Sequence, residues 1–212
     1  MKKALIISGG EYSLPILSNE YDYIIACDKG YEYALRLNLI PDVIIGDFDS
    51  TSIDLITSNI QDSKTQLITH PIRKDDTDTM LAIKHALQLG FLHIHIICGL
   101  GLRMDHTIAN IQSMLYVALN GGICEMDSAT EYFRTVTPEN GIVSISKKEN
   151  FSLSLFALTD TVRKVTINGT SYDCITDLTN SFPLGHGNHF VSDEAKISIE
   201  EGVLLVVSSH EK

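Results

Sequence analysis

Basic residues are scarce in this chain. It has 16 Lys and Arg against 27 Asp and Glu, which gives a formal net charge of −11 at pH 7. Binding to nucleic-acid phosphates requires clustered Lys and Arg, and the sequence contains no such cluster. The composition therefore argues against a nucleic-acid partner and suits a protein that recruits a metal ion.

Long hydrophobic runs are also missing. No run approaches the roughly 18 to 20 apolar residues of a membrane span. The apolar run at residues 4–8 is too short for a secretory segment and is typical of a first core strand. We expect a soluble, cytoplasmic protein with no membrane partner.

Cysteine is rare and scattered. Cys27, Cys98, Cys124 and Cys174 lie far apart, each beside apolar residues, and none forms a Cys-x-x-Cys pair. This spacing favours buried free thiols over a metal or redox role.

Two familiar phosphate-binding motifs are absent. The chain has no Gly-x-x-x-x-Gly-Lys-Ser/Thr loop and no Gly-x-Gly-x-x-Gly after its first strand. Neither a P-loop kinase nor a dinucleotide enzyme is indicated. If ATP binds, we expect it to bind through metal and backbone.

Alternating strands and helices fill the first part of the 212 residues. Two helical patterns, at 77–89 and 105–119, are clear, and shorter helices are plausible after Ser13, Gly30 and Ser52. The predicted strands lie at 4–8, 23–27, 42–46, 66–69, 93–98 and 123–126. The alternation predicts an α/β, Rossmann-like domain at 1–129, a mostly parallel sheet with helices on both faces.

The pattern changes near residue 130. Short β-branched segments separated by turns then follow, at 130–136, 141–146, 151–155, 164–167, 195–199 and 203–207. We predict an all-β sandwich domain at 130–212. Because about 80 residues bury little core of their own, this domain should pack on something.

Most of the unusual polar residues of the first domain follow predicted strands. In parallel α/β sheets, ligands bind outside the carboxyl ends of the strands. The loops that reach this edge of the sheet are 9–10, 27–30, 47–50, 70–78 and 99–106. We therefore expect one site to collect side chains from all five loops.

The loop after the third predicted strand carries Asp47 and Asp49. Residues i and i+2 of an extended segment point the same way, so the two carboxylates can converge. At 4 Å and an effective dielectric near 20 they repel by about 4 kcal/mol, which calls for a cation or a shared proton. The alternative is that both are solvated loop acids or caps of the next helix.

The next loop carries Asp75, Asp76 and Asp78 just before a helix. One Asp or Thr here could cap that helix, but three carboxylates exceed what capping needs. Mg²⁺ prefers oxygen ligands and is commonly held by one or two carboxylates plus substrate phosphates. The pattern is typical of a nucleotide–metal site.

The loop at 99–106 supplies glycines and positive charge. Its glycines allow close approach to a phosphate, and Arg103 can make a forked contact to phosphate oxygens. Alternatively, Arg103 pairs with Asp105 or another acid of the same edge. His106 could donate to phosphate or simply bond the neighbouring loop.

These motifs together resemble the thiamine pyrophosphokinase family. The matching segments, in order, are Asp28-Lys29-Gly30, residues 41–50, residues 74–78 and residues 103–110. The resemblance implies Mg²⁺-dependent transfer of a pyrophosphoryl group from ATP to the hydroxyl of thiamine, giving thiamine diphosphate and AMP. It also implies a homodimer in which the α/β nucleotide domain of one subunit and the β-sandwich of the other enclose thiamine.

The resemblance also implies residue roles. Asp47, Asp49 and Asp78 match the metal and pyrophosphate acids. The implied catalytic residues are Asp49, Asp78, Arg103 and Asp105, and the implied ligand-binding residues are Asp28, Lys29, Asp75, Thr77, Arg103, His106 and Asn188. Near the end of the chain, residues 185–189 keep Asn188 but lack the serine that the family commonly places before it.

Two other interpretations remain open. Asp47-Phe48-Asp49-Ser50 also resembles the Asp-x-Asp motif of haloacid-dehalogenase-type phosphatases, although there the motif closes the first strand and here the third. A non-catalytic module that senses a nucleotide or vitamin would use the same acids without turnover.

Overall fold

The chain folds into two compact units. The computed structural model describes residues 1–13, 21–48, 56, 64–71, 75–101 and 103–211. Contacts group Met1–Ser113 with Asp127–Ala129 as the first unit, and Met114–Met126 with Thr130–Lys212 as the second. The separate domains predicted at 1–129 and 130–212 stay a prediction.

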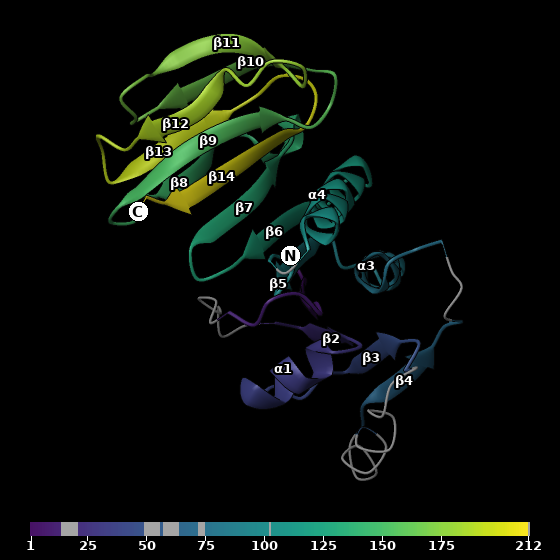
Figure 1. Ribbon diagram of the computed structural model, residues 1–212. Coiled ribbons are helices and arrows are strands. Elements are labelled where there is room, and N and C mark those ends of the chain that lie inside the picture. Colours follow the sequence, from purple (N-terminus) through teal and green to yellow (C-terminus); the bar gives the residue numbers. More distant parts are fainter. Residues whose placement is uncertain (14–20, 49–55, 57–63, 72–74, 102, 212) are drawn as a thin grey trace. The chain divides into compact units, whose positions relative to one another are not determined.

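Parallel strands form the centre of the first unit (Figure 1). Their order is β5-β1-β2-β3-β4, and every neighbouring pair is parallel. The strands are β1 (Lys3–Ile7), β2 (Tyr23–Cys27), β3 (Val43–Gly46), β4 (Gln66–Thr69) and β5 (His93–Ile97). The predicted parallel sheet is confirmed, with strand ends within one residue of those expected.

Helices α1 (Gly30–Arg36) and α3 (Asp78–Gln88) lie on opposite faces of this sheet. Ile24 packs with the cluster that includes residues of α1, whereas Tyr23 and Cys27 contact α3 through His85 and Asp78. Successive strand side chains point to opposite faces, so the two helices must be on different sides. The predicted helices on both faces are confirmed.

Helix α3 confirms the helix predicted at 77–89, because the sequence signals for its start, its buried face and its end all agree. Thr77 caps it, its buried positions Thr79, Ala82, Ile83 and Ala86 recur at helical spacing, and Gly90 follows its end. A second long helix, α4 (Met104–Leu119), confirms the prediction at 105–119. The short helices expected after Ser13 and Ser52 fall outside the described residues. Within the described part of the chain, no helix is long and apolar enough to cross a membrane.

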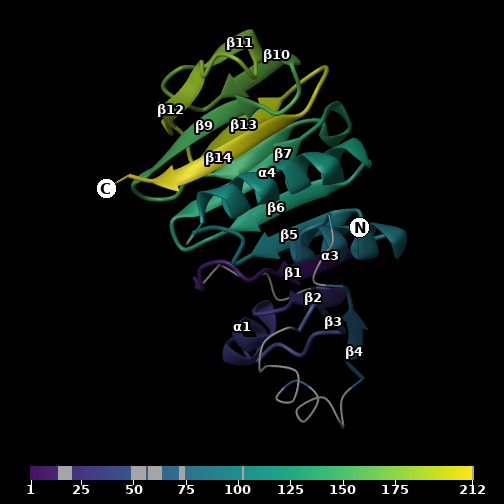
Figure 2. The ribbon, with the colours of Figure 1, turned by 45° about the vertical axis from the view of Figure 1, so that its right-hand side comes forward.

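The order of the parallel strands locates a crevice. The chain runs from β1 to β2, β3 and β4 in one direction and then returns to place β5 on the other side of β1. The connections that follow β1 and β5 therefore lead in opposite directions along the sheet, which leaves a crevice at the carboxyl ends of these strands. Ligands bind in such crevices in parallel α/β sheets. Figure 2 shows these strands side by side.

The second unit contains antiparallel sheets. One has the order β12-β9-β14-β7, and a separate four-stranded sheet has the order β11-β10-β13-β8. Apart from Asp127, the last residue of β6, which groups with the first unit, its elements are β6 (Ile123–Asp127), β7 (Glu131–Val136), η1 (Pro138–Asn140), β8 (Val143–Ser146), β9 (Phe151–Ala157), β10 (Thr161–Asn168), β11 (Cys174–Thr179), β12 (Gly185–His189), β13 (Glu194–Ser198) and β14 (Leu204–His210).

Both antiparallel sheets contribute to one hydrophobic cluster. Leu153 and Leu204 come from the first sheet, and Val165 and Ile197 from the second, all with at most 1% exposure. Burying one such side chain contributes about 1.5 to 3 kcal/mol. The cluster therefore stabilises the contact between the two sheets.

The thiols follow the sequence prediction with one exception. All four cysteines are free, and Cys27, Cys98 and Cys124 are buried as predicted. Cys174 is exposed, so the expectation of four buried thiols is wrong there. The physical reason is that Cys174 begins β11, a strand at the edge of its sheet.

Candidate active site

A pocket of about 480 Å³ lies at the carboxyl ends of β1, β2 and β5. It coincides with the crevice that the strand order predicts. The lining residues come from the strand ends and from the first turns of α3 and α4: Ser8, Gly9, Gly10, Cys27, Asp28, Lys29, Thr77, Asp78, Thr79, Gly99, Gly101, Asp105, His106, Ala109 and Asn110. We call this the strand-end pocket.

Gly10 is required where the loops after β1 and β5 cross. A Cβ at this position would lie 2.6 Å from the carbonyl oxygens of both Cys98 and Leu100. Backbone bonds fix the crossing: Gly10 N donates to Cys98 O at 2.8 Å, and Glu11 N donates to Leu100 O at 2.8 Å. The two glycine-containing loops thus form a joined wall of the pocket.

Three non-glycine residues in left-handed conformation follow the strands of this edge. They are Asp28 (φ 42°) after β2, Phe48 (φ 49°) after β3 and Cys98 (φ 54°) after β5. Such backbone is sparsely populated and clusters at functional sites, where the surrounding structure holds it in place. The strain marks the same edge of the sheet as the pocket.

At the start of α3, capping and pocket lining are divided between two residues. Thr77 accepts a hydrogen bond from Met80 N at 3.1 Å and so caps the helix. Asp78, in the first turn, lines the pocket, while Asp76 pairs with Lys84 at 2.6 Å. The capping alternative is therefore met by Thr77, and the Asp78 carboxylate is not the cap.

Arg103 makes the ion pair that the sequence analysis left open. Its Nε and Nη2 donate to the two carboxylate oxygens of Asp105 at 3.1 and 2.6 Å. The hydrogen bond from Arg103 is the main reason that the pKa of Asp105 is lowered, with the His106 amide acting in the same direction. Both side chains are about two-thirds exposed, at 66% and 63%, so the pair lies at the mouth of the pocket.

Three buried polar residues of the pocket were missed by sequence reasoning. They are Ser8, Thr79 and Asn110, each 5% exposed. The Ser8 and Thr79 hydroxyls lie 2.8 Å apart, and Asn110 Nδ2 donates to Gly99 O at 2.6 Å. Only Asn110 left a usable signal, because it follows His106 by four residues and so shares its helix face.

The predicted catalytic and ligand-binding residues that the structure describes in the first unit divide into three groups. Asp28, Lys29, Thr77, Asp78, Asp105 and His106 all line the strand-end pocket. Arg103 reaches the pocket through Asp105, as described above. Asp75 is exposed and does not line it.

The predicted metal ligands Asp47, Asp49 and Asp78 are partly located. Asp78 lines the pocket, Asp47 follows Gly46 at the end of β3, and Asp49 lies outside the described residues. A Cβ on Gly46 would lie 3.2 Å from Asp28 Cβ, so the end of β3 lies against Asp28. Oxygen donors of this kind suit Mg²⁺, although the described residues contain no group of three metal-ligating side chains.

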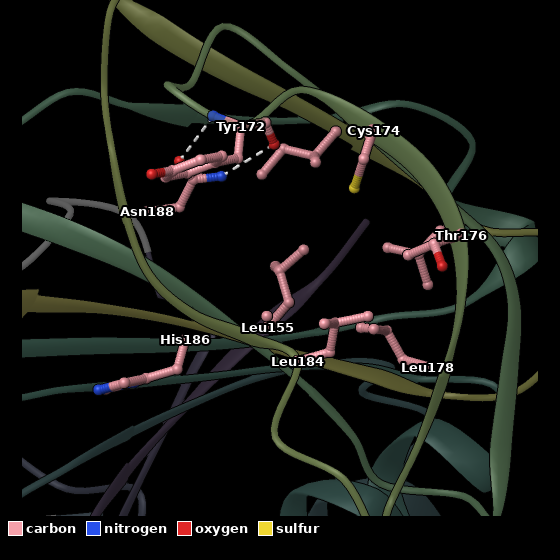
Figure 3. Close-up of a pocket in the computed structure, with 11 residues that line it drawn as sticks. Leu155, Tyr172, Cys174, Thr176, Leu178, Leu184, His186 and Asn188 are labelled. Carbon is pink, nitrogen blue, oxygen red and sulfur yellow. Dashed lines mark hydrogen bonds between the residues drawn. The ribbon is translucent and has the colours of Figure 1, made fainter.

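Asn188 lies in the second unit, where it lines a different pocket of about 450 Å³ (Figure 3). Most of this pocket is apolar. Its walls come from both antiparallel sheets and the segments beside them: Leu155, Val165, Ile167, Tyr172, Cys174, Thr176, Leu178, Leu184, Gly185, His186 and Asn188. We call this the inter-sheet pocket.

The Asn188 amide is engaged within the protein. Its Nδ2 donates to Thr170 Oγ1 and Tyr172 O at 2.9 and 3.1 Å, and its Oδ1 accepts from Tyr172 N at 3.1 Å. Figure 3 shows the amide clamped to the backbone of Tyr172, whose exposed ring lies at the pocket. In this conformation Asn188 orders the Tyr172 backbone and has no N–H left for a ligand.

Comparison with known proteins gives one consistent result. The family model for the thiamin pyrophosphokinase catalytic domain matches residues 14–124. The thiamine pyrophosphokinase of Bacillus subtilis (strain 168) is 28% identical over 218 residues, covering 99% of both chains.

Solved structures agree. The Enterococcus faecalis thiamin pyrophosphokinase family protein has a TM-score of 0.82 at 28% identity and covers 100% of both chains. Thiamin pyrophosphokinase from Candida albicans, at 16% identity, shares the fold with a TM-score of 0.76, covering 98% of this chain and 89% of its own. The matched segment is more than half of the chain and includes most of the strand-end pocket. The chain belongs to the thiamin pyrophosphokinase family.

Proposed function

We propose that this protein is a thiamine pyrophosphokinase that transfers a pyrophosphoryl group from ATP to the hydroxyl of thiamine, releasing AMP. The observation that carries the proposal is the strand-end pocket, where glycine loops, Lys29 and the acids Asp28, Asp78 and Asp105 meet in a member of this family. Glycine loops suit phosphate oxygens, and acids suit a metal ion that accompanies them.

The chemistry is mainly electrostatic. Attack by an alcohol on the β-phosphorus builds negative charge on the phosphoryl oxygens and on the departing AMP. Lys29 lines the pocket, and Arg103 can turn from Asp105 toward phosphate because the pair is exposed. Cations held at these positions stabilise the developing charge without a covalent intermediate.

We propose Mg²⁺ as the cofactor, with Asp78, Asp47 and Asp49 as its protein ligands and Asp28 beside them. Of these, Asp28 and Asp78 line the pocket. When bound, the ion would neutralise phosphate charge and orient the triphosphate. A pocket acid could orient the thiamine hydroxyl or accept its proton.

We further propose that thiamine contacts the second unit, as a β-sandwich domain, and that the first unit is a Rossmann-like nucleotide domain. The inter-sheet pocket supports this proposal because its apolar walls and the Tyr172 ring suit an aromatic heterocycle. A homodimer would then supply the two domains from different subunits. Sedimentation equilibrium at micromolar protein concentration tests the dimer. A measured mass equal to that of one chain would contradict it.

A direct assay tests the reaction. Purified protein is incubated with ATP, Mg²⁺ and thiamine, and AMP and thiamine diphosphate are quantified by mass spectrometry. We expect both products in equal amounts, and neither when thiamine or Mg²⁺ is omitted. AMP no higher than in the no-thiamine control would contradict the kinase proposal and leave the phosphatase and the non-catalytic sensing interpretations.

The phosphatase interpretation requires Asp47 as a nucleophile in the site. Asp47 follows β3, the third strand along the chain, whereas the phosphatase motif closes the first strand. A stable or trapped phosphoryl adduct at Asp47 would nevertheless support the phosphatase interpretation.

The cytoplasmic location stays a prediction, supported by the four free thiols.

A further inference from the structure

The loop after β5, residues 98–101, has a hydrogen-bond donor for each of its carbonyl oxygens. Cys98 O accepts from Gly10 N, Leu100 O accepts from Glu11 N, and Gly101 O accepts from Arg103 N at 2.6 Å. These three bonds join the loop to the backbone around it. The remaining carbonyl, that of Gly99, has no backbone partner among the loop hydrogen bonds of the described residues.

Asn110 supplies the missing donor. Its Nδ2 donates to Gly99 O at 2.6 Å from a side chain on α4 that is 5% exposed. Gly99 and Asn110 both line the strand-end pocket, so this bond lies in its wall. All four consecutive carbonyl oxygens of residues 98–101 therefore accept a hydrogen bond.

An unpaired carbonyl in this wall would oppose the proposed ligand. A carbonyl oxygen carries partial negative charge, and so does each oxygen of a triphosphate. Pairing the Gly99 oxygen with an amide donor offsets that charge and fixes the peptide plane between Gly99 and Leu100. The loop can then approach an anion without a bare carbonyl facing it.

We propose that Asn110 is a positioning residue for the triphosphate: by holding the Gly99 carbonyl, it keeps the 98–101 loop in the form that accepts ATP. Asn110 acts through Gly99 and has no role in the chemical step. The inference rests on the proposed function, because it assigns the polyphosphate of ATP to the strand-end pocket. It adds a residue to which the sequence comparison gave no role.

Asn110→Asp is the most informative change. It keeps the shape of the side chain but replaces the donor with a carboxylate facing the Gly99 oxygen. Asn110→Gln keeps the donor on a side chain one methylene longer and serves as the conservative rescue. Ser113→Ala is the matched control, because Ser113 lies on the same helix, is 2% exposed and bonds a backbone carbonyl, that of Ala109, without lining the pocket.

The measurement separates ATP from thiamine. We expect Asn110→Asp to raise the KM for ATP about tenfold or more, the equivalent of about 1.4 kcal/mol, while the KM for thiamine changes less than twofold. Asn110→Gln should recover most of the ATP affinity, and Ser113→Ala should match the wild type. Equal changes in both KM values, or lower thermal stability with an unchanged KM for ATP, would overturn the inference.

A binding assay distinguishes this inference from the proposed function. Inorganic tripolyphosphate with Mg²⁺ is titrated calorimetrically into the wild type and each variant. If the wild type makes no AMP yet binds tripolyphosphate, and Asn110→Asp weakens that binding, the proposed reaction fails while Asn110 keeps its role. A wild type that binds no tripolyphosphate, or variants that bind it equally, would overturn the role of Asn110.

Discussion

The two pockets are similar in size and opposite in construction. The strand-end pocket, of about 480 Å³, is made from loops at the ends of buried parallel strands, with glycines and acids in its lining. The inter-sheet pocket, of about 450 Å³, is made from side chains of antiparallel strands and the segments beside them, mostly apolar. The first pocket presents charged side chains and backbone from loops, whereas the second presents mainly apolar side chains.

The difference follows from how each sheet ends. Parallel strands are buried on both faces, so polar groups gather at the strand ends, and ligands bind outside the carboxyl ends. Antiparallel sheets expose edge strands, and in the second unit β11 and β12 are the terminal strands that border the pocket. We therefore expect mutations to affect ATP at the first pocket and thiamine at the second.

The largest effect should come from Asp78→Asn. It removes a carboxylate from the strand-end pocket without removing the Thr77 cap, so we expect kcat to fall on the order of 100-fold or more while the fold persists. The control is Asp76→Asn, just before α3, which removes the part-buried ion pair with Lys84 and does not change the lining of the pocket. Kinetics at saturating Mg²⁺ and circular dichroism give the readout. Equal kcat values in the two variants would contradict the proposal that Asp78 is a metal ligand.

Gly30→Ala should be the next largest, and it acts on stability. A Cβ on Gly30 would collide with the Ile7 carbonyl at the end of β1, so we expect a loss of about 2 to 3 kcal/mol in the free energy of unfolding. Gly187→Ala in β12 is the control: its Cβ would meet no atom within 4 Å, and its positive φ should cost only about 1 kcal/mol. Urea denaturation measures both. A smaller loss for Gly30 than for Gly187 would contradict the close approach of α1 to β1.

The sequence predicted the first unit well because several signals agree there. Buried parallel strands are near-continuous apolar runs, and α3 has a cap, a periodic face and a terminal glycine. The chain order of the strands then predicts where the polar loops meet. Buried partners such as Ser8 and Thr79 could not be predicted, because their pairing joins residues 71 positions apart.

The second unit was harder to predict at its edges. β11 is mostly exposed, and β12, with the sequence Gly-His-Gly-Asn-His, has no apolar residue, so neither showed a strand pattern. β12 is a strand because it pairs with β9, not because of local preference. For the same reason the clamp that Asn188 forms on Tyr172 could not be predicted, and Asn188 was interpreted as a ligand-binding residue.

Tyr172→Ala should have a smaller effect, confined to thiamine. Tyr172 is 74% exposed, so its loss should change stability by less than about 0.5 kcal/mol. Losing an aromatic contact worth about 0.5 to 1.5 kcal/mol should raise the KM for thiamine by up to roughly tenfold and leave the KM for ATP unchanged. Phe182→Ala is the control, since it is also exposed but does not line the inter-sheet pocket. Equal KM values for thiamine in the two variants would place thiamine elsewhere.

The smallest effect concerns the exposed pair at the mouth of the strand-end pocket. Arg103 lowers the pKa of Asp105 below its ordinary value of 3.8, so the stabilisation it gives is present above that value and is lost as the pH falls through the lowered pKa. Arg103→Gln should return the pKa of Asp105 toward 3.8, with almost no change in stability at neutral pH because solvent screens the pair.

Carbon-13 NMR of the carboxyl groups measures this titration, and a similar pair in the second unit provides the control. The hydrogen bond from Lys196 is the main reason that the pKa of Glu194 is lowered, and Arg103→Gln should leave that pKa unchanged. A non-hydrolysable ATP analogue with Mg²⁺ sharpens the comparison. If Arg103 turns to phosphate, the analogue must raise the pKa of Asp105 in the wild type and have little effect on that of Glu194. An Asp105 pKa that stays lowered with the analogue bound would mean that Arg103 remains paired and takes no part in binding ATP.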